Sequence, residues 1–168
     1  APQTDLGGAA RRMPLLVDES DSLLDSFVQA RRLGYQGVSS KSCKGFYKSA
    51  LNAARCAQGA PGHLFMSGED LTMQAGVGVQ QDLALVGWLG LSHVERNGHH
   101  YVNGMAALSE EEQCNFLNAV PSLYERSNGA VRLRIEGGQI DLSSLSNATG
   151  FGGTGAVGAG IQWDAMRT

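Results

Sequence analysis

Short strand-like segments alternate with segments of helical periodicity over most of the chain, and this alternation constrains the fold more than any other feature. Strands are predicted at 13–17, 37–40, 64–66 and 91–94. Between them, apolar residues at helical spacing predict three helices, one capped by Ser20 or Asp21 and ending at Gly34, one from Phe46 to about Ala57, and one from Leu71 to Trp88. Because parallel strands need long crossovers, this order predicts an α/β fold with a parallel sheet covered by helices.

The strand starts lie about 25 residues apart and define four strand–helix units. A complete (β/α)₈ barrel takes roughly 250 residues, so a chain of 168 residues has room for half of one. We therefore predict a partial (β/α)₈ TIM-type barrel followed by a hairpin segment. The predicted organisation is a loop or cut end at 1–12, four units at 13–108, a closing region at 109–152 and a glycine-rich tail at 153–168.

The pattern changes beyond Gly98. Ser109 and Glu112 have the spacing of a capping box, which predicts a helix from this point to about Leu123. The alternating residues 131–135, the paired Gly137 and Gly138, and the apolar positions in 139–142 predict a two-stranded hairpin. The segment 150–160 is rich in glycine but lacks the GxxxxGK[ST] pattern, so it predicts a flexible tail and not a phosphate-binding loop.

Composition excludes several classes of protein. The net charge of −3 argues against a general nucleic-acid binder, and the longest apolar runs, such as 83–91, are too short to span a bilayer. No charged-then-apolar leader follows Ala1. The three cysteines (Cys43, Cys56 and Cys114) show neither a disulfide framework nor a CxxC metal pattern, which favours a reducing compartment. We expect a cytoplasmic protein that binds neither nucleic acid nor membrane.

Polar residues follow each predicted strand, where the side chains of a parallel sheet converge at one mouth. In chain order they are Asp18 and Glu19, then Lys41, then Ser67, Glu69 and Asp70, then His93 and Glu95. A carboxylate at such a position can bind a hard divalent cation. A lysine among cationic neighbours or in a dry site can lose its proton near neutral pH and act as a base.

Each of these residues also has an ordinary structural explanation. Asp18 could cap a helix, and Lys41 and Lys44 could be solvated side chains. Glu69 and Asp70 could complement the dipole of the helix that follows them.

Two other chemistries are less favoured. His93, His99 and His100 suggest zinc, but no second group of ligands has compatible spacing. Cys43 lies between two lysines, but no histidine is near it in the sequence to activate a nucleophile.

Two motifs resemble a known family. The segments Leu16-Val17-Asp18-Glu19-Ser20 and Gly37-Val38-Ser39-Ser40-Lys41-Ser42-Cys43-Lys44-Gly45 look like the ends of the fifth and sixth barrel strands of the enolase superfamily, in its mandelate racemase/muconate-lactonizing group. The resemblance covers roughly residues 13–152. It implies that this chain is the carboxyl-terminal half of the barrel.

The resemblance also implies roles for single residues. Asp18 matches the position of a magnesium ligand, Lys41 that of the acid/base, and Lys44 that of a supporting positive charge. Ser67 and Glu69 fall where the seventh strand presents polar groups to the substrate. His93 and Glu95 fall, less closely, where some members have a DxD motif for substrate recognition. The implied reaction removes a proton α to a carboxylate and could be a racemisation, epimerisation, cycloisomerisation or dehydration.

The departures from the family pattern shape the functional hypothesis. Only Asp18 of three acidic metal ligands is present, and the lysine pair of the second strand and the amino-terminal capping domain are absent. We therefore expect the carboxyl-terminal part of a Mg²⁺-dependent isomerase or lyase, completed by further chain or by another subunit, homo-oligomeric, and acting on a small carboxylate. The alternatives are a non-catalytic half-barrel that assembles with itself or a separate chain, and a small binding module for an anionic metabolite.

Overall fold

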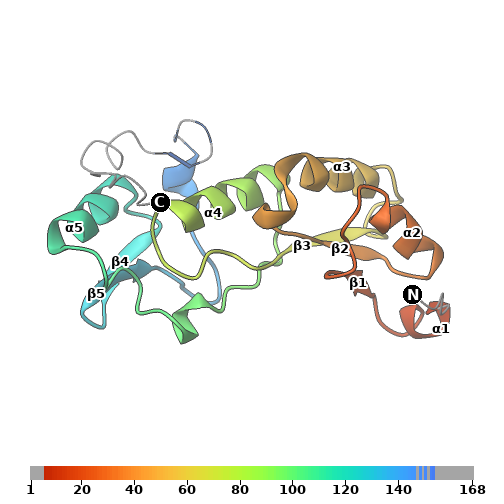
Figure 1. Ribbon diagram of the computed structural model, residues 1–168, viewed down its shortest axis with the longest axis horizontal. Helices are drawn as coiled ribbons and strands as arrows, with labels where there is room; N and C mark the ends of the chain where they lie inside the picture. Colours follow the sequence, from red (N-terminus) through yellow and green to blue (C-terminus); the bar gives the residue numbers. More distant parts are fainter. Residues whose placement is uncertain (1–5, 147, 149, 151, 154–168) are drawn as a thin grey trace, which may run out of the picture. The chain divides into compact units, whose positions relative to one another are not determined.

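The computed structural model describes residues 6–146, 148, 150, 152 and 153 (Figure 1). The chain divides into two compact units, Ala1–Leu71 with Leu85–Arg96, and Thr72–Ala84 with Asn97–Thr168. The described helices are α1 (Gly7–Ala10), α2 (Ser26–Arg32), α3 (Phe46–Ala57), α4 (Val77–Leu89) and α5 (Glu110–Ala119). The described strands are β1 (Leu16–Val17), β2 (Gly37–Ser40), β3 (Phe65–Gly68), β4 (Tyr124–Ser127) and β5 (Ala130–Leu133).

The first unit contains a parallel sheet in the order β1-β2-β3. A single parallel bridge between Gly68 and Val94 adds the fourth predicted segment beside β3, without a full strand. The predicted parallel sheet is therefore confirmed at three strands.

One face of this sheet forms the core of the first unit. Val17, Val38 and Met66 are aligned by the strand register and pack with Phe27 of α2, and α3 lies along the sheet (Figure 1). Because successive strand residues point to opposite faces, the residues between them point away from this core. On that second face the ring of Phe65 lies over the bare backbone of Gly37, where an added Cβ would come within 2.4 Å of the ring.

The second unit is built on the antiparallel hairpin of β4 and β5. Asn128 and Gly129 connect the strands, with φ values of 51° and 76°. Positive φ at both positions is typical of the type I′ turn, which suits the right-handed twist of paired strands. The ring of Phe116 in α5 contacts that of buried Tyr124 edge-on, at 6.0 Å between centroids.

The hairpin predicted around Gly137 and Gly138 is wrong. The segment 131–133 belongs to β5, the second strand of the observed hairpin, and it pairs back to residues 124–126 of β4. At the paired glycines only one bridge forms, between Glu136 and Gln139. The Asn128-Gly129 pair is the stronger turn signal, because Asn and Gly both tolerate the left-handed conformation.

Two predicted helix starts are also wrong, and one capping prediction is confirmed. Neither Ser20 nor Asp21 caps α2, which begins at Ser26. The helix predicted from Leu71 begins at Val77, because Gly76 has a φ of +139° that no α-helix accommodates. The capping box of Ser109 and Glu112 is present at the start of α5, which ends at Ala119 because Val120 leaves the helical conformation.

The chain is thus a mixed α/β protein with a three-stranded parallel sheet and a small antiparallel sheet. Within the described residues the sheet does not close into a barrel, so the half-barrel stays a hypothesis. The predicted loop at 1–12 includes the short helix α1, and the glycine-rich tail lies outside the described residues apart from Gly150, Gly152 and Gly153. In the described part, every helix is too short or too polar to cross a bilayer.

Candidate functional site

The carboxyl ends of β1, β2 and β3 bring a group of charged side chains together on the face of the sheet opposite the core. The register pairs Ser39 with Ser67, and Ser39 donates a hydrogen bond to Asp18, the residue after β1. Lys41 and Glu69 follow Ser39 and Ser67 by two residues, just past the ends of β2 and β3, so they point to the same face of the sheet. The residues of this cluster are therefore selected by strand register and by the two-residue period of a β-strand.

Lys41 lies at the centre of the cluster. Its side chain is only 3% exposed, and its Nζ lies 2.9 Å from Asp18 Oδ1, 2.8 Å from Glu19 Oε1 and 2.6 Å from Asp70 Oδ2. Asp70 reaches this position with a φ of 52°, a left-handed conformation that Asp tolerates better than most residues. One buried ammonium group therefore binds three carboxylates that follow two different strands.

Lys44 and Ser39 also hold Asp18 in place. Lys44 Nζ lies 2.7 Å from the Asp18 backbone oxygen, 3.2 Å from Asp18 Oδ1 and 2.9 Å from Ser39 Oγ. Ser39 Oγ donates to Asp18 Oδ1 at 2.5 Å. The single oxygen Oδ1 thus accepts from a hydroxyl group and two ammonium groups.

These contacts move the pKa values of Asp18 and Lys41 in opposite directions. Burial alone would raise the pKa of the Asp18 carboxyl, but hydrogen bonds from Ser39, Lys41 and Lys44 outweigh burial and hold it well below its ordinary value. Burial alone would lower the pKa of Lys41, but hydrogen bonds to Asp70, Glu19 and Asp18 outweigh it and raise the pKa far above the ordinary value. We expected a dry site to release the lysine proton; its anionic neighbours retain it instead.

Glu69 is the carboxyl group of the cluster whose pKa is raised. Burial is the main cause, and the neighbouring charge of Asp18 adds to it, against the hydrogen bond from Ser67, whose Oγ lies 2.5 Å from Glu69 Oε1. Catalytic sites often contain two adjacent carboxyl groups whose pKa values are pushed apart, so that one stays ionised while the other takes up and gives a proton.

A buried ion pair holds the loop that presents Asp18 and Glu19. Lys48 of α3 donates to the backbone oxygen of Asp21, and its Nζ lies 3.1 Å from Asp21 Oδ2. The Asp21 amide in turn donates to the Asp18 backbone oxygen at 2.8 Å. Helix α3 therefore fixes the start of the β1–α2 loop against the end of β2.

The structure does not bring every predicted site residue into this cluster. Lys41, Lys44, Asp18, Ser67 and Glu69 belong to it, as described above. The segment of His93 and Glu95 is joined to β3 by its backbone: the Gly68 amide donates to the His93 oxygen, and the Glu95 amide donates to the Gly68 oxygen, both at 2.8 Å. Both side chains are exposed. Their substrate-binding roles remain predictions.

The ordinary explanations for the cluster residues do not hold. Asp18 caps no helix, since the residue before α2 is Asp25. Lys41 is buried and Lys44 is half-buried, so neither is a solvated lysine. Glu69 and Asp70 precede α4 by several residues and are not in its first turn.

The cluster does not by itself match a magnesium site. Within the described residues, no group of three or more His, Cys, Asp or Glu side chains is arranged to hold a metal ion. The Asp18 oxygen that would face a cation already accepts from Ser39 and two lysines. Mg²⁺ requires near-octahedral oxygen ligation, so a metal centre here would need ligands from beyond these residues. Among the described residues, His93, His99 and His100 do not form such a group either.

Sequence reasoning missed the roles of Ser39, Asp21 and Lys48. Ser39 could have been found from the two-residue period, because it precedes Lys41 on the same face of β2. The pairing of Asp21 with Lys48 spans a helix and a loop, so no local pattern indicates it. The three cysteines are free, as their spacing predicts.

Comparisons with family models, with curated proteins and with solved structures find no match for the chain. The class that fold and cluster define is an α/β protein with a lysine–carboxylate site at the carboxyl end of a parallel sheet. The resemblance to the enolase superfamily stays a hypothesis based on the two motifs.

Proposed function

We propose that this chain provides the proton-transfer part of an enzyme that removes a proton α to a carboxylate, as a racemase, epimerase, cycloisomerase or dehydratase does. The observation behind the proposal is the buried ammonium group of Lys41 among three carboxylates at the mouth of the sheet. A small carboxylate substrate would replace the exposed partners of Lys41, since the Glu19 and Asp70 side chains are 85% and 57% exposed.

Charge development in the reaction favours such a site. Removing an α-proton places negative charge on the oxygens of the substrate carboxylate, and fixed positive groups stabilise that charge in the transition state. Lys41 and Lys44 both lie within 3.2 Å of Asp18 Oδ1, so two ammonium groups border one position. Lys41 can hold a substrate carboxylate in place of Glu19 and Asp70, and both positive charges would stabilise its enediolate.

Proton transfer is assigned to Lys41 and Glu69. Lys41 is charged while it binds Glu19 and Asp70, and in this form it can return a proton to the substrate. It becomes a base only when those carboxylates release it. Glu69, whose pKa burial raises, is closer to the range in which a carboxyl group both takes and gives a proton.

Magnesium enters this proposal only with ligands from outside the described residues. In such an assembly Asp18 would be the ligand from this chain, and the ion would supply further positive charge to the substrate carboxylate. The steps assigned to Lys41 and Glu69 do not depend on it.

Exchange of the α-proton with solvent tests the proposal. The full chain is incubated in D₂O with Mg²⁺ and a panel of 2-hydroxy, 2-amino and unsaturated carboxylic acids, and loss of the α-proton signal is followed by NMR. We expect exchange with at least one acid, reduced about 100-fold or more by Lys41→Met, since one acid/base group contributes about 10²–10⁴. The exposed Arg12→Gln variant is the matched control. Exchange that persists in Lys41→Met would refute the assignment.

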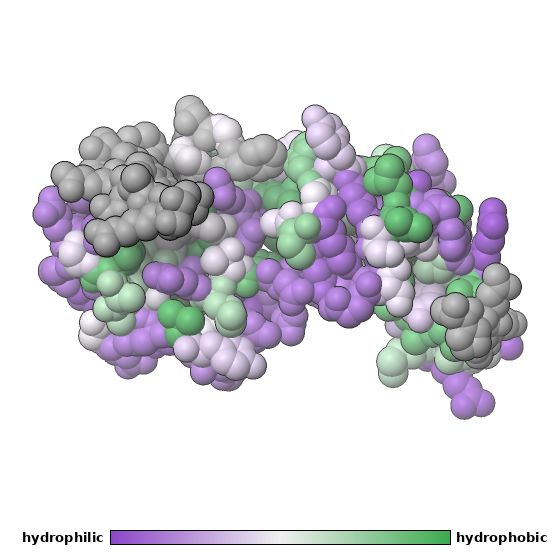
Figure 2. Space-filling view, viewed as in Figure 1, coloured by the Kyte–Doolittle hydropathy of each residue, from purple (hydrophilic) through white to green (hydrophobic). Residues whose placement is uncertain are grey.

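A second function, non-catalytic assembly, is favoured by the edge of the sheet. Within the described residues β1 pairs only with β2, so its other edge is open to a further strand. Apolar residues also interrupt the polar surface around α2 and α3 (Figure 2), and Leu23 and Leu24 are 64% and 62% exposed. Light scattering of the purified chain decides: a stable oligomer without proton exchange supports assembly, and a monomer refutes it.

A further inference from the structure

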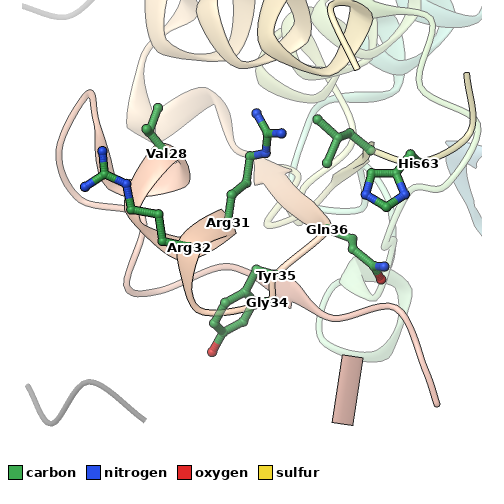
Figure 3. Close-up of a pocket in the computed structure, with 8 residues that line it drawn as sticks. Val28, Arg31, Arg32, Gly34, Tyr35, Gln36 and His63 are labelled. Carbon is green, nitrogen blue, oxygen red and sulfur yellow. The ribbon is translucent and has the colours of Figure 1, made fainter. Parts of the chain in front are cut away.

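The first unit has a second concave feature at the opposite end of its sheet. A cavity of about 480 Å³ is lined by Val28, Arg31, Arg32, Gln36, His63 and Leu64, among others (Figure 3). Gln36 immediately precedes β2, and Leu64 immediately precedes β3. The cavity therefore lies at the amino ends of the strands, whereas the lysine–carboxylate cluster lies at their carboxyl ends.

The positive charge of this cavity is not neutralised by the described residues. The guanidinium groups of Arg31 and Arg32 make no hydrogen bond or ion pair within the part of the chain that the structure describes. Among the described residues that line the cavity, none has an acidic side chain. Arg31 and Arg32 end α2, where the helix dipole favours cations. The helix dipole explains why arginines stand at the end of α2, but it does not explain why they line a cavity.

The side chains in Figure 3 separate into two groups. Arg31, Gln36 and His63 lie on one side of the end of α2, and the guanidinium of Arg32 points the other way. The side-chain amide of Gln36 has no hydrogen-bond partner among the described residues, and its Oε1 is buried. Turning this amide therefore breaks no hydrogen bond, and its NH₂ group is available as a donor.

We propose that this cavity binds an organic anion, a carboxylate or a phosphate monoester, with the anionic group held by Arg31, His63 and the Gln36 amide. A guanidinium group matches the paired oxygens of carboxylate or phosphate. The apolar part of the ligand would lie against Val28 and Leu64. The volume is within the range of small-molecule sites and larger than a bare phosphate ion needs. This site is separate from the proposed active site and does not depend on it.

Titration of the ¹⁵N-labelled full chain tests the site, with phenyl phosphate, benzoate and inorganic phosphate as probes at constant low ionic strength. We expect saturable shifts of the amides of residues 34–36 and 63, with an organic anion binding more tightly than inorganic phosphate. Arg31→Gln should weaken binding about tenfold or more, because it removes a charge-assisted hydrogen-bond pair. Arg12→Gln removes an exposed cation that does not line the cavity and should leave the affinity unchanged.

The remaining outcomes overturn the proposal. These are shifts that do not saturate, an equal loss of affinity in Arg12→Gln, and shifts confined to the residues around Lys41 and Lys44. Proton exchange measured in Arg31→Gln separates this site from the proposed function: loss of anion binding with normal exchange assigns the cavity a role of its own. A failure of exchange in the unmodified protein would leave the titration result unaffected.

Discussion

Replacing Lys48 with methionine is the sharpest test of how the candidate site is held in place. The substitution keeps most of the side-chain volume but removes the charge that pairs with Asp21. The two side chains are 8% and 1% exposed, and neither Asp21 carboxylate oxygen has another hydrogen-bond partner among the described residues. Breaking a pair buried this deeply typically costs about 3–5 kcal/mol, because one charge stays buried alone. We expect Lys48→Met to lower the free energy of unfolding by that amount.

A double-mutant cycle measured by urea unfolding gives the coupling between the two groups. Asp21→Asn should cost less than Lys48→Met, since the amide still offers an oxygen to the ammonium group. The combined variant should be more stable than the sum of the single losses predicts, by at least about 1 kcal/mol. Additive losses, or a loss under about 1 kcal/mol in Lys48→Met, would show that the pair is solvated. The exposed Arg12→Gln variant should unfold like the unmodified chain.

The electrostatics and packing of the two units give three other expected results. The folded pKa of Asp18 lies below its unfolded value of about 3.9, so its contribution to stability is complete above about pH 5 and is lost as the pH falls toward the folded pKa. Lys41→Met should flatten this part of an acid titration followed by circular dichroism; an unchanged slope would contradict the ion pair. Tyr124→Phe removes two buried hydrogen bonds of the hydroxyl group and should destabilise the second unit by about 1–3 kcal/mol, measured by urea unfolding, whereas an unchanged midpoint would mean that the hydroxyl is solvated. Arg126→Gln breaks an exposed ion pair with Glu110 and an exposed hydrogen bond to Cys114 Sγ, and it should leave the urea midpoint in place; a clear shift would show that these contacts are shielded from water.

The parallel sheet and its cluster could be predicted because they depend on local patterns. The periodicity placed strands near 13–17, 37–40 and 64–66, and parallel pairing brings their carboxyl ends together whatever the helices do. Asp18, Lys41 and Glu69 therefore meet even though α2 and α4 begin several residues later than predicted. The exact start of a helix has little influence on where a strand ends.

What the sequence left undetermined depends on interactions between distant residues. Asp21 has the residue type of a helix cap, but burial against Lys48 gives it another role. The hairpin was misplaced because two turn signals, Asn128-Gly129 and Gly137-Gly138, flank the same apolar strand. The choice between them is made by packing, since Val131 is fully buried and Phe116 of α5 packs on Tyr124.

The protonation of Lys41 shows most clearly why a site cannot be assigned from residue types alone. Burial without partners would make the lysine a base near neutral pH, whereas burial among three carboxylates keeps it a cation for as long as they bind it. The sequence supplies both the lysine and the acids, but only the geometry fixes their distances. Two of the three acids, Glu19 and Asp70, are exposed enough to turn into solvent. A substrate anion could displace both of them. Lys41 would then be paired with the carboxylate of the substrate and with Asp18, so substrate binding itself would set the charge state of Lys41 in which proton transfer begins.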